Sequence, residues 1–319
     1  MARYTLRTVE VAKVSGKMPS NCRYRLEDVA LKASVKKLGV LVPLIVTGGE
    51  SPVLVTGHRR FVAARECGLR EVPALEAGEL SGQDAFILNL VSNWRQEFSE
   101  MDRAFAIARA AGELGFRESE VRKAVMPLLG LSEDAAVLEF YREVHGCPAA
   151  FKDLIEDGIL PFRGISFFLQ LSRADQEYFA KVTGKTVRLT SSQLLQIGEW
   201  LVDLVKSGGK DLETLFREHK LPELLDVPGM DPRTGADKLF SGIRRIRFPG
   251  YTGQLEKFDD HSAFILRDAK NLSLRPVEGF EERGFEIRAR VRTPEELDIL
   301  LKKLSQERSA LNSLFDVML

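Results

Sequence analysis

The residues of this chain best suited to chemistry stand together in Thr56-Gly57-His58-Arg59-Arg60. A short apolar run precedes them, and an Ala-rich helical pattern begins at once, with both arginines in its first turn. A helix N-terminus presents backbone N–H groups that have no intrahelical acceptor, together with the positive end of the helix dipole. With two guanidinium groups added, the stretch predicts an anion site that suits phosphate. The alternative is a capped surface helix whose arginines pair with carboxylates.

Composition and charge exclude several classes of protein. The 319 residues suffice for two or three domains, and no apolar run approaches a membrane span. The first residues show no apolar signal segment, so we expect a cytoplasmic protein with no membrane contact. Three scattered cysteines and four histidines form neither a disulfide framework nor a zinc pattern. Lys and Arg number 46, as do Asp and Glu, so we expect no broad basic surface of the kind that binds duplex DNA mainly through its phosphates.

Residues 1–98 alternate short strands with short helices, which predicts a small α/β domain. Gly39 and Gly68 stand where helix C-caps belong, and glycine, proline and asparagine occupy the turns. The expected elements are strands at 6–15, 40–46, 53–56 and 71–75 and helices at 26–38 and 57–67.

Residues 99–220 are expected to form a helical middle domain, followed by a Pro- and Gly-rich linker at 221–235. A helix-turn-helix would pair a helix at 118–128 with a second helix starting at Ser132. The second helix begins with Glu133 and Asp134, which would face DNA phosphates. Because like charges repel, this helix is poorly suited to recognise DNA bases. Either this acidic helical region binds a protein partner, or DNA specificity comes from elsewhere.

Residues 236–319 are expected to form a C-terminal module of strands and a helix. The predicted strands are 243–248, 262–267, 272–274 and 285–292, and Thr293-Pro294 begins a leucine-rich helix. The fold class is therefore α+β and multidomain. Arginines in these strands form either a solvated, salt-bridged face or a candidate DNA or anion patch; they are Arg244, Arg245, Arg247, Arg288, Arg290 and Arg292.

The order of the N-terminal motifs is that of a known family. Gly39-Val40-Leu41-Val42-Pro43-Leu44-Ile45-Val46, then Gly57-His58-Arg59-Arg60-Phe61-Val62-Ala63-Ala64, then Gly68-Leu69 and Val72-Pro73, resembles the N-terminal domain of ParB chromosome and plasmid partition proteins. The resemblance is specific over 36–75 and extends loosely over 6–200.

The resemblance implies a CTP-binding domain, shared in outline with sulfiredoxin, in a homodimer that CTP closes into a clamp sliding on DNA. Gly57, Arg59 and Arg60 would hold the triphosphate, with His58 beside them, and Gly39 would line the pocket. Arg95 matches the arginine of a third family motif. The family's habit of C-terminal dimerisation raises the same expectation for the terminal leucine helix.

Three departures from the family pattern bear on catalysis. His58 replaces a glutamate, and Val91 and Ser92 occupy the Glu and Asn positions of the third motif, which serve hydrolysis and Mg²⁺. Ser92 or Asn93 remains a candidate Mg²⁺ ligand, and Asn89 is an alternative after a local shift. We therefore expect nucleotide binding with at most weak CTPase activity. Sulfiredoxin chemistry is rejected, because its cysteine would stand at His58.

The predicted function is a nucleotide-gated, dimeric DNA-binding clamp of the partition type. A second interpretation is an adaptor of the same fold that binds nucleotide and protein without sequence-specific DNA binding. A third is a phosphoryl-transfer or nuclease enzyme, which needs an acidic metal ligand such as Glu66, Glu76 or Glu79 near the pocket.

Overall fold

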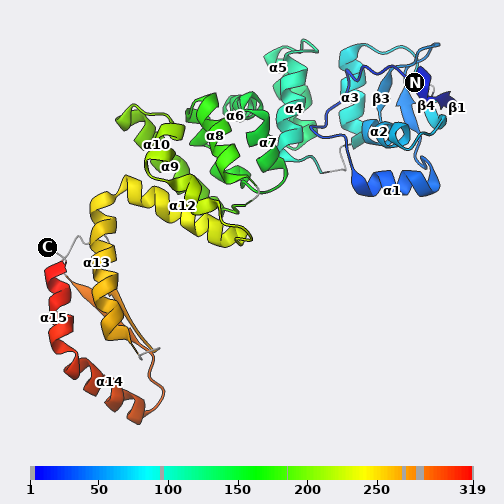
Figure 1. The fold of residues 1–319 in the computed structure, drawn as a ribbon. Coiled ribbons are helices and arrows are strands. Elements are labelled where there is room, and N and C mark those ends of the chain that lie inside the picture. Colours follow the sequence, from blue (N-terminus) through cyan, green and yellow to red (C-terminus); the bar gives the residue numbers. More distant parts are fainter. Residues whose placement is uncertain (1–3, 94–96, 185, 268–270, 278–283, 318–319) are drawn as a thin grey trace. The chain divides into compact units, whose positions relative to one another are not determined.

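The computed structural model describes residues 4–93, 97–184, 186–267, 271–277 and 284–317. Its contacts divide the chain into two compact units (Figure 1). The first holds residues 1–185 and 189–194, and the second holds residues 186–188 and 195–319. This division falls near residue 190, whereas the sequence led us to expect domain boundaries after residue 98 and at 221–235. No helix in the described ranges is both long and apolar enough to cross a bilayer.

A four-stranded mixed sheet in the order β1-β4-β2-β3 forms the N-terminal part of the first unit. β1 is antiparallel to β4, β4 is parallel to β2, and β2 is antiparallel to β3. Helices α1 and α2 pack against each other. The bounds are β1 (Thr5–Glu10), α1 (Val29–Leu38), β2 (Leu44–Val46), β3 (Leu54–Thr56), α2 (His58–Glu66) and β4 (Glu71–Glu76).

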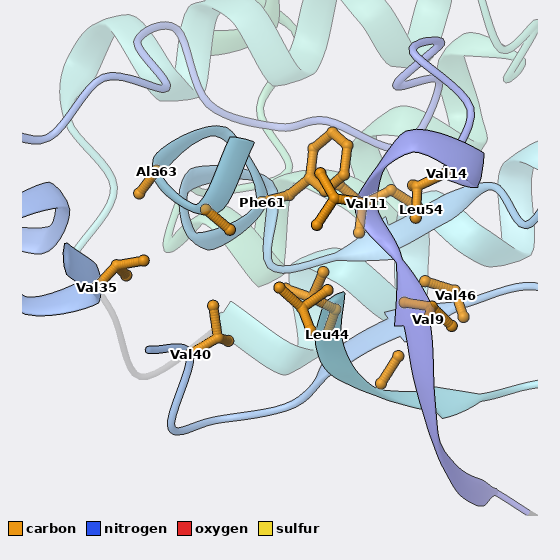
Figure 2. Packing of buried hydrophobic residues seen from close by; sticks show 13 residues of the cluster. Val9, Val11, Val14, Val35, Val40, Leu44, Val46, Leu54, Phe61 and Ala63 are labelled. Atoms are coloured by element: carbon orange, nitrogen blue, oxygen red, sulfur yellow. The ribbon is translucent and has the colours of Figure 1, made fainter. Parts of the chain in front are cut away.

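The core of this domain lies between the sheet and the two helices (Figure 2). Leu44 and Leu54 from the strands and Phe61 from α2 are almost fully buried. Burying one such side chain stabilises the fold by about 1.5–3 kcal/mol, so strand β3 and helix α2 are held together at the Thr56-Gly57 junction. That junction is where the sequence places the anion site.

The expected buried strand at 40–46 is shorter in the structure. Only Leu44–Val46 forms strand β2, while Leu41 and Val42 are exposed. Pro43 has no N–H to donate to a neighbouring strand, and the Val42 carbonyl accepts a hydrogen bond from Arg60 Nη1 instead. This loop is therefore tied to α2 and not to the sheet.

The rest of the first unit is helical. Ser99 caps α4 through a capping box with Asp102. The expected first helix of the helix-turn-helix is broken: α5 passes into a π-helical turn at Val121–Val125 and a 3-10 turn at Met126–Leu129, which contains Pro127. The second helix begins later than predicted, because Asp134 and not Ser132 is its N-cap. The helices are α3 (Gly82–Asn93), α4 (Glu100–Ala111), α5 (Glu118–Glu120), α6 (Ala135–Gly146), α7 (Ala149–Glu156) and α8 (Arg173–Thr183).

The second unit contains more helix than the sequence suggested. A two-stranded antiparallel hairpin, β5 with β6, packs with α13 and α15 around Phe258, Ile265, Leu274 and Leu314. The bounds are α9 (Ser191–Gly208), α10 (Leu212–Glu218), α11 (Leu221–Leu225), α12 (Pro232–Arg247), α13 (Pro249–Leu266), β5 (Leu272–Pro276), β6 (Phe285–Ala289), α14 (Pro294–Gln306) and α15 (Arg308–Val317).

Two predicted strands of the C-terminal module are wrong. Residues 243–248 lie mostly in α12 and residues 262–267 mostly in α13. Asp231 caps α12, and Leu239 and Ile243 are buried at the i, i+4 spacing of a helix. The helical spacing of these buried residues determines the structure here, despite the β-branched and aromatic residues that suggested strands.

The predicted linker at 221–235 also contains helix. Leu221 and Leu225 are buried one turn apart in α11, and Pro232 occupies the first turn of α12, where proline is tolerated. The helix predicted from Thr293 is confirmed at its start, since Thr293 caps α14, but it is interrupted at Glu307 before α15 begins.

A buried ion pair joins the N-terminal domain to α4 and yields a stability prediction. Arg23 Nη1 lies 2.7 Å from Asp102 Oδ2, and both side chains are buried. Asp102→Ala removes the carboxylate that compensates the charge of the buried guanidinium, which costs about 3–5 kcal/mol of unfolding free energy. Urea denaturation followed by circular dichroism measures this loss.

The control is Glu213→Ala, which removes the partner of Arg217 in an ion pair whose two side chains are both exposed. A surface pair contributes at most about 1 kcal/mol, so this variant should unfold almost as the parent does. Equal losses in the two variants would contradict a structural role for the buried pair.

Candidate functional site

A cavity of about 240 Å³ opens at the N-terminus of α2 in the first unit. Residues from four parts of the chain meet there: the segment before α1, the start of α1, the start of α2 and the end of α3. The lining residues are Cys22, Arg23, Asp28, Leu31, Gly57, His58, Arg59, Arg60, Asn89 and Asn93.

Gly57 starts α2 in a conformation that other residues rarely adopt. Its φ is 93°, and a Cβ built there would lie 2.7 Å from Leu44 Cδ2. Glycine therefore allows the turn from β3 into α2 and brings the backbone close to the core. No side chain caps this helix. Its first N–H groups consequently remain available to a ligand at the cavity.

Arg60 is held in place by the loop before β2. Its Nη1 donates hydrogen bonds to the carbonyl oxygens of Val42 and Pro43, the latter at 2.8 Å. Its Nη2 lies close to Gly57, 3.1 Å from where a Cβ would stand. Burial lowers the pKa of the guanidinium, which still stays charged at neutral pH. Arg60 thus places a fixed positive charge at the helix N-terminus.

Arg59 is held more loosely. Its Nη1 lies 3.8 Å from Asp28 Oδ2, and its Nε donates a 3.4 Å hydrogen bond to the carbonyl of Arg25. The other oxygen of Asp28 caps α1 by accepting from the Leu31 N–H at 2.9 Å. Long contacts of this kind leave Arg59 free to turn toward a stronger anionic partner.

His58 lines the cavity in its neutral form and is not a base. It is 4% exposed, and its Nε2 lies 3.4 Å from Ser20 Oγ. Burial, with the positive charges of Arg109 and Arg60 in addition, lowers its pKa to about 3. A group with that pKa cannot hold a proton at neutral pH and is a weak general base.

Helix α3 brings two asparagines to the cavity. Asn89 donates to the Ser20 carbonyl at 2.7 Å, and its Oδ1 accepts from Asn93 Nδ2 at 2.8 Å. Ser92, the other candidate metal ligand, is exposed, donates to the Leu88 carbonyl and does not line the cavity. The spacing of Asn89 and Asn93, four residues apart on one helix, is the signal in the sequence that favours them over Ser92.

Two further predicted residues are not brought to the cavity. Gly39 terminates α1 with φ 72° and does not line it. Arg95 lies outside the described residues. Four lining residues were not predicted from the sequence, because they reach the cavity through tertiary packing: Cys22, Arg23, Asp28 and Leu31. The one local signal was Asp28, an N-cap type immediately before a helical pattern.

The six C-terminal arginines do not form one strand face. Arg244, Arg245 and Arg247 lie on α12, and the other three lie on or beside β6. Arg245 pairs with Glu256, Arg247 with Asp203 at 3.2 Å and Arg288 with Glu286 at 2.6 Å. These three side chains are therefore paired with carboxylates, on two separate elements and not on one strand face. Arg290 and Arg292 have no carboxylate partner for their side chains within the described ranges.

No family model matches the chain, but its sequence is similar to that of several partition proteins. It is 36% identical over 112 residues to the chromosome-partitioning protein Spo0J of Thermus thermophilus, covering 34% of this chain and 41% of that protein. It is 28% identical over 209 residues to a probable chromosome-partitioning protein ParB of Pseudomonas putida, covering 63% and 68%. The match to the Thermus protein thus spans about two fifths of that relative's length.

Solved structures give a weaker likeness. A C-terminally truncated ParB of Caulobacter crescentus complexed with CTP-gamma-S is 19% identical, with a TM-score of 0.25, and the match covers 56% of this chain and 97% of that one. A TM-score this low carries no argument, so the likeness rests on the sequence matches and on the motifs that resemble the ParB pattern. The chain is thus similar in sequence to chromosome-partitioning proteins of the ParB and Spo0J type.

Proposed function

We propose that the cavity at α2 binds CTP and that the nucleotide gates a dimeric, DNA-binding clamp of the partition type. One observation carries the proposal: Gly57, Arg59 and Arg60, the residues that match the ParB triphosphate motif, all line one cavity at an uncapped helix N-terminus. Helix amides, the helix dipole and guanidinium groups each favour phosphate oxygens.

The first turn of α2 would hold the triphosphate. Backbone N–H groups after Gly57 would donate to phosphate oxygens, and Arg60, whose guanidinium is oriented by the Val42 and Pro43 carbonyls, would supply positive charge. Arg59 exchanges its 3.8 Å contact with Asp28 for a shorter, charge-assisted contact with phosphate. Binding therefore rearranges Arg59 while Arg60 stays in place.

The cavity suits Mg²⁺ held jointly with the nucleotide, and it suits hydrolysis poorly. Mg²⁺ on a nucleotide is usually bound through one or two carboxylates and the phosphates, and Asp28 and Asn93 are the oxygen donors at hand. No group of three His, Cys, Asp or Glu residues that could hold a metal exists in the described part of the chain. With His58 neutral and Asp28 engaged as the N-cap of α1 and as the partner of Arg59, CTPase activity is weak at most.

We call residues 20–25 the strap. This segment runs from the cavity to the helical region and acts as the gate. Tyr24 Oη donates to Asp153 of α7 at 3.0 Å, and Arg25 forms ion pairs with Asp153 and Asp157. Arg59 donates to the carbonyl of the same Arg25. When Arg59 moves onto phosphate, its hydrogen bond to the Arg25 carbonyl is lost. Nucleotide binding therefore changes the interactions that hold the strap beside α7.

A second candidate, an adaptor that binds nucleotide and protein without sequence-specific DNA contacts, is favoured by the start of α6. Glu133 and Asp134 are exposed there, and Asp134 is fixed as the N-cap. Carboxylates at this point repel the phosphates that a recognition helix must approach.

Nucleotide binding is tested with Arg59→Ala. Loss of a charge-assisted contact should weaken CTP binding about tenfold or more in a calorimetric titration, while ATP, GTP and UTP bind the parent more weakly than CTP. Arg65→Ala, at the exposed end of the same helix, is the matched control and should bind CTP as the parent does. CTP affinity that is equal in all three proteins would contradict the proposed site.

DNA binding separates the clamp from the adaptor. We expect the chain to bind mixed-sequence duplex in low salt and to lose affinity steeply as salt rises, because phosphate contacts release counterions. Fluorescence anisotropy of a labelled duplex, with and without CTP, measures both effects. No binding in low salt with CTP present would favour the adaptor.

The buried, neutral His58 predicts how stability depends on pH. Its pKa is about 3 in the folded chain and about 6.5 when unfolded, so its contribution is complete above pH 6.5 and declines as pH falls toward 3. Between pH 7 and pH 5 the parent should lose on the order of 2 kcal/mol more unfolding free energy than His58→Gln.

Urea denaturation at the two pH values provides the measurement, and His219→Gln, at an exposed histidine, should behave as the parent. The same loss in the parent and in His58→Gln would show that His58 is not kept neutral by the fold.

A further inference from the structure

A second, larger cavity lies in the second unit and shares no residue with the cavity at α2. Its volume is about 1010 Å³, and its walls come from α9, α12, α13 and β5. Four aromatic side chains line it. The Trp200 ring centroid lies 5.0 Å from that of Phe240 and 5.6 Å from that of Phe248, and Tyr251 follows on α13. The volume is at the upper end for ligand cavities and exceeds that of any one side chain.

Two arginines add charge to this aromatic cavity. The guanidinium of Arg244 lies over the ring of Tyr251, 4.7 Å from its centroid, and Arg275 is exposed on β5. Arg275 stands opposite Glu286 in the hairpin, but the Glu286 carboxylate contacts Arg288 at 2.6 Å. Within the described ranges neither lining arginine has a carboxylate partner. Both retain donors for an anionic group of a partner.

The surroundings disfavour a nucleic acid as that partner. Arg245 and Arg247, the other arginines in the last turn of α12, are neutralised by Glu256 and Asp203. Asp259 itself lines the cavity and would repel phosphates. Among the residues that line the cavity, positive charge is therefore limited to Arg244 and Arg275 and does not form the continuous groove that tracks a nucleic-acid backbone.

We propose that this cavity docks a segment of a partner protein that inserts an aromatic or long aliphatic side chain among the four rings and places a carboxylate on the exposed Arg275. Trp, Tyr and Arg are the residue types that carry most binding energy at protein interfaces. The aromatic rings accept the apolar anchor, and Arg275 selects an acidic neighbour of that anchor.

The test selects binders from a random linear peptide library on the immobilised full chain. Enriched peptides should share an aromatic or long aliphatic residue next to Asp or Glu. Affinity of a labelled, enriched peptide is then measured by fluorescence anisotropy. We expect it to fall at least about tenfold in Trp200→Ala and in Arg275→Glu, because each removes a central contact.

Arg245→Ala is the matched control, since Arg245 lies in the same helical turn as Arg244 but is paired with Glu256 and does not line the cavity. It should leave peptide affinity unchanged. The exposed Arg275→Glu keeps the test decisive if Trp200→Ala fails to fold. Enrichment of basic peptides, affinity that is insensitive to Arg275→Glu, or displacement of the peptide by single-stranded DNA would each overturn the proposal.

Discussion

The close approach of Gly57 to Leu44 is the constraint on which the N-terminal domain depends. β3 ends in the core and α2 must begin without a gap, so the connecting residue adopts a φ of 93° with its backbone against a buried leucine side chain. Any side chain at this position would collide with the core. The same constraint leaves the helix without a side-chain cap and exposes its first N–H groups to a cavity. A folding requirement and an anion site thus share one residue.

The two arginines after this turn have different roles although they are adjacent. Arg60 is fixed by two loop carbonyls, whereas Arg59 rests on long contacts with Asp28 and with the strap. A fixed charge provides affinity, and a loosely held one provides a response to the ligand. Because the strap continues through the buried Arg23–Asp102 pair and through Arg25 to α7, the response has a physical route into the helical region.

The sequence predicted those parts of the molecule that local chemistry decides. The turn at Gly57, the start of α2 and the caps at Ser99 and Thr293 follow from residues within a few positions of one another. Asp28 and Asn89 reach the cavity only through the packing of α1 and α3, which a motif does not encode. The C-terminal strands at 243–248 and 262–267 were wrong because aromatic and β-branched composition was weighted above the helical spacing of buried residues.

Hydrogen–deuterium exchange of the full chain with and without CTP tests the site at the start of α2 most directly. CTP should slow exchange of the amides of residues 57–60, which lack acceptors at the helix start, and change exchange in residues 20–25. Exchange at residues 57–60 that is identical with and without saturating CTP would contradict a phosphate site at the N-terminus of α2.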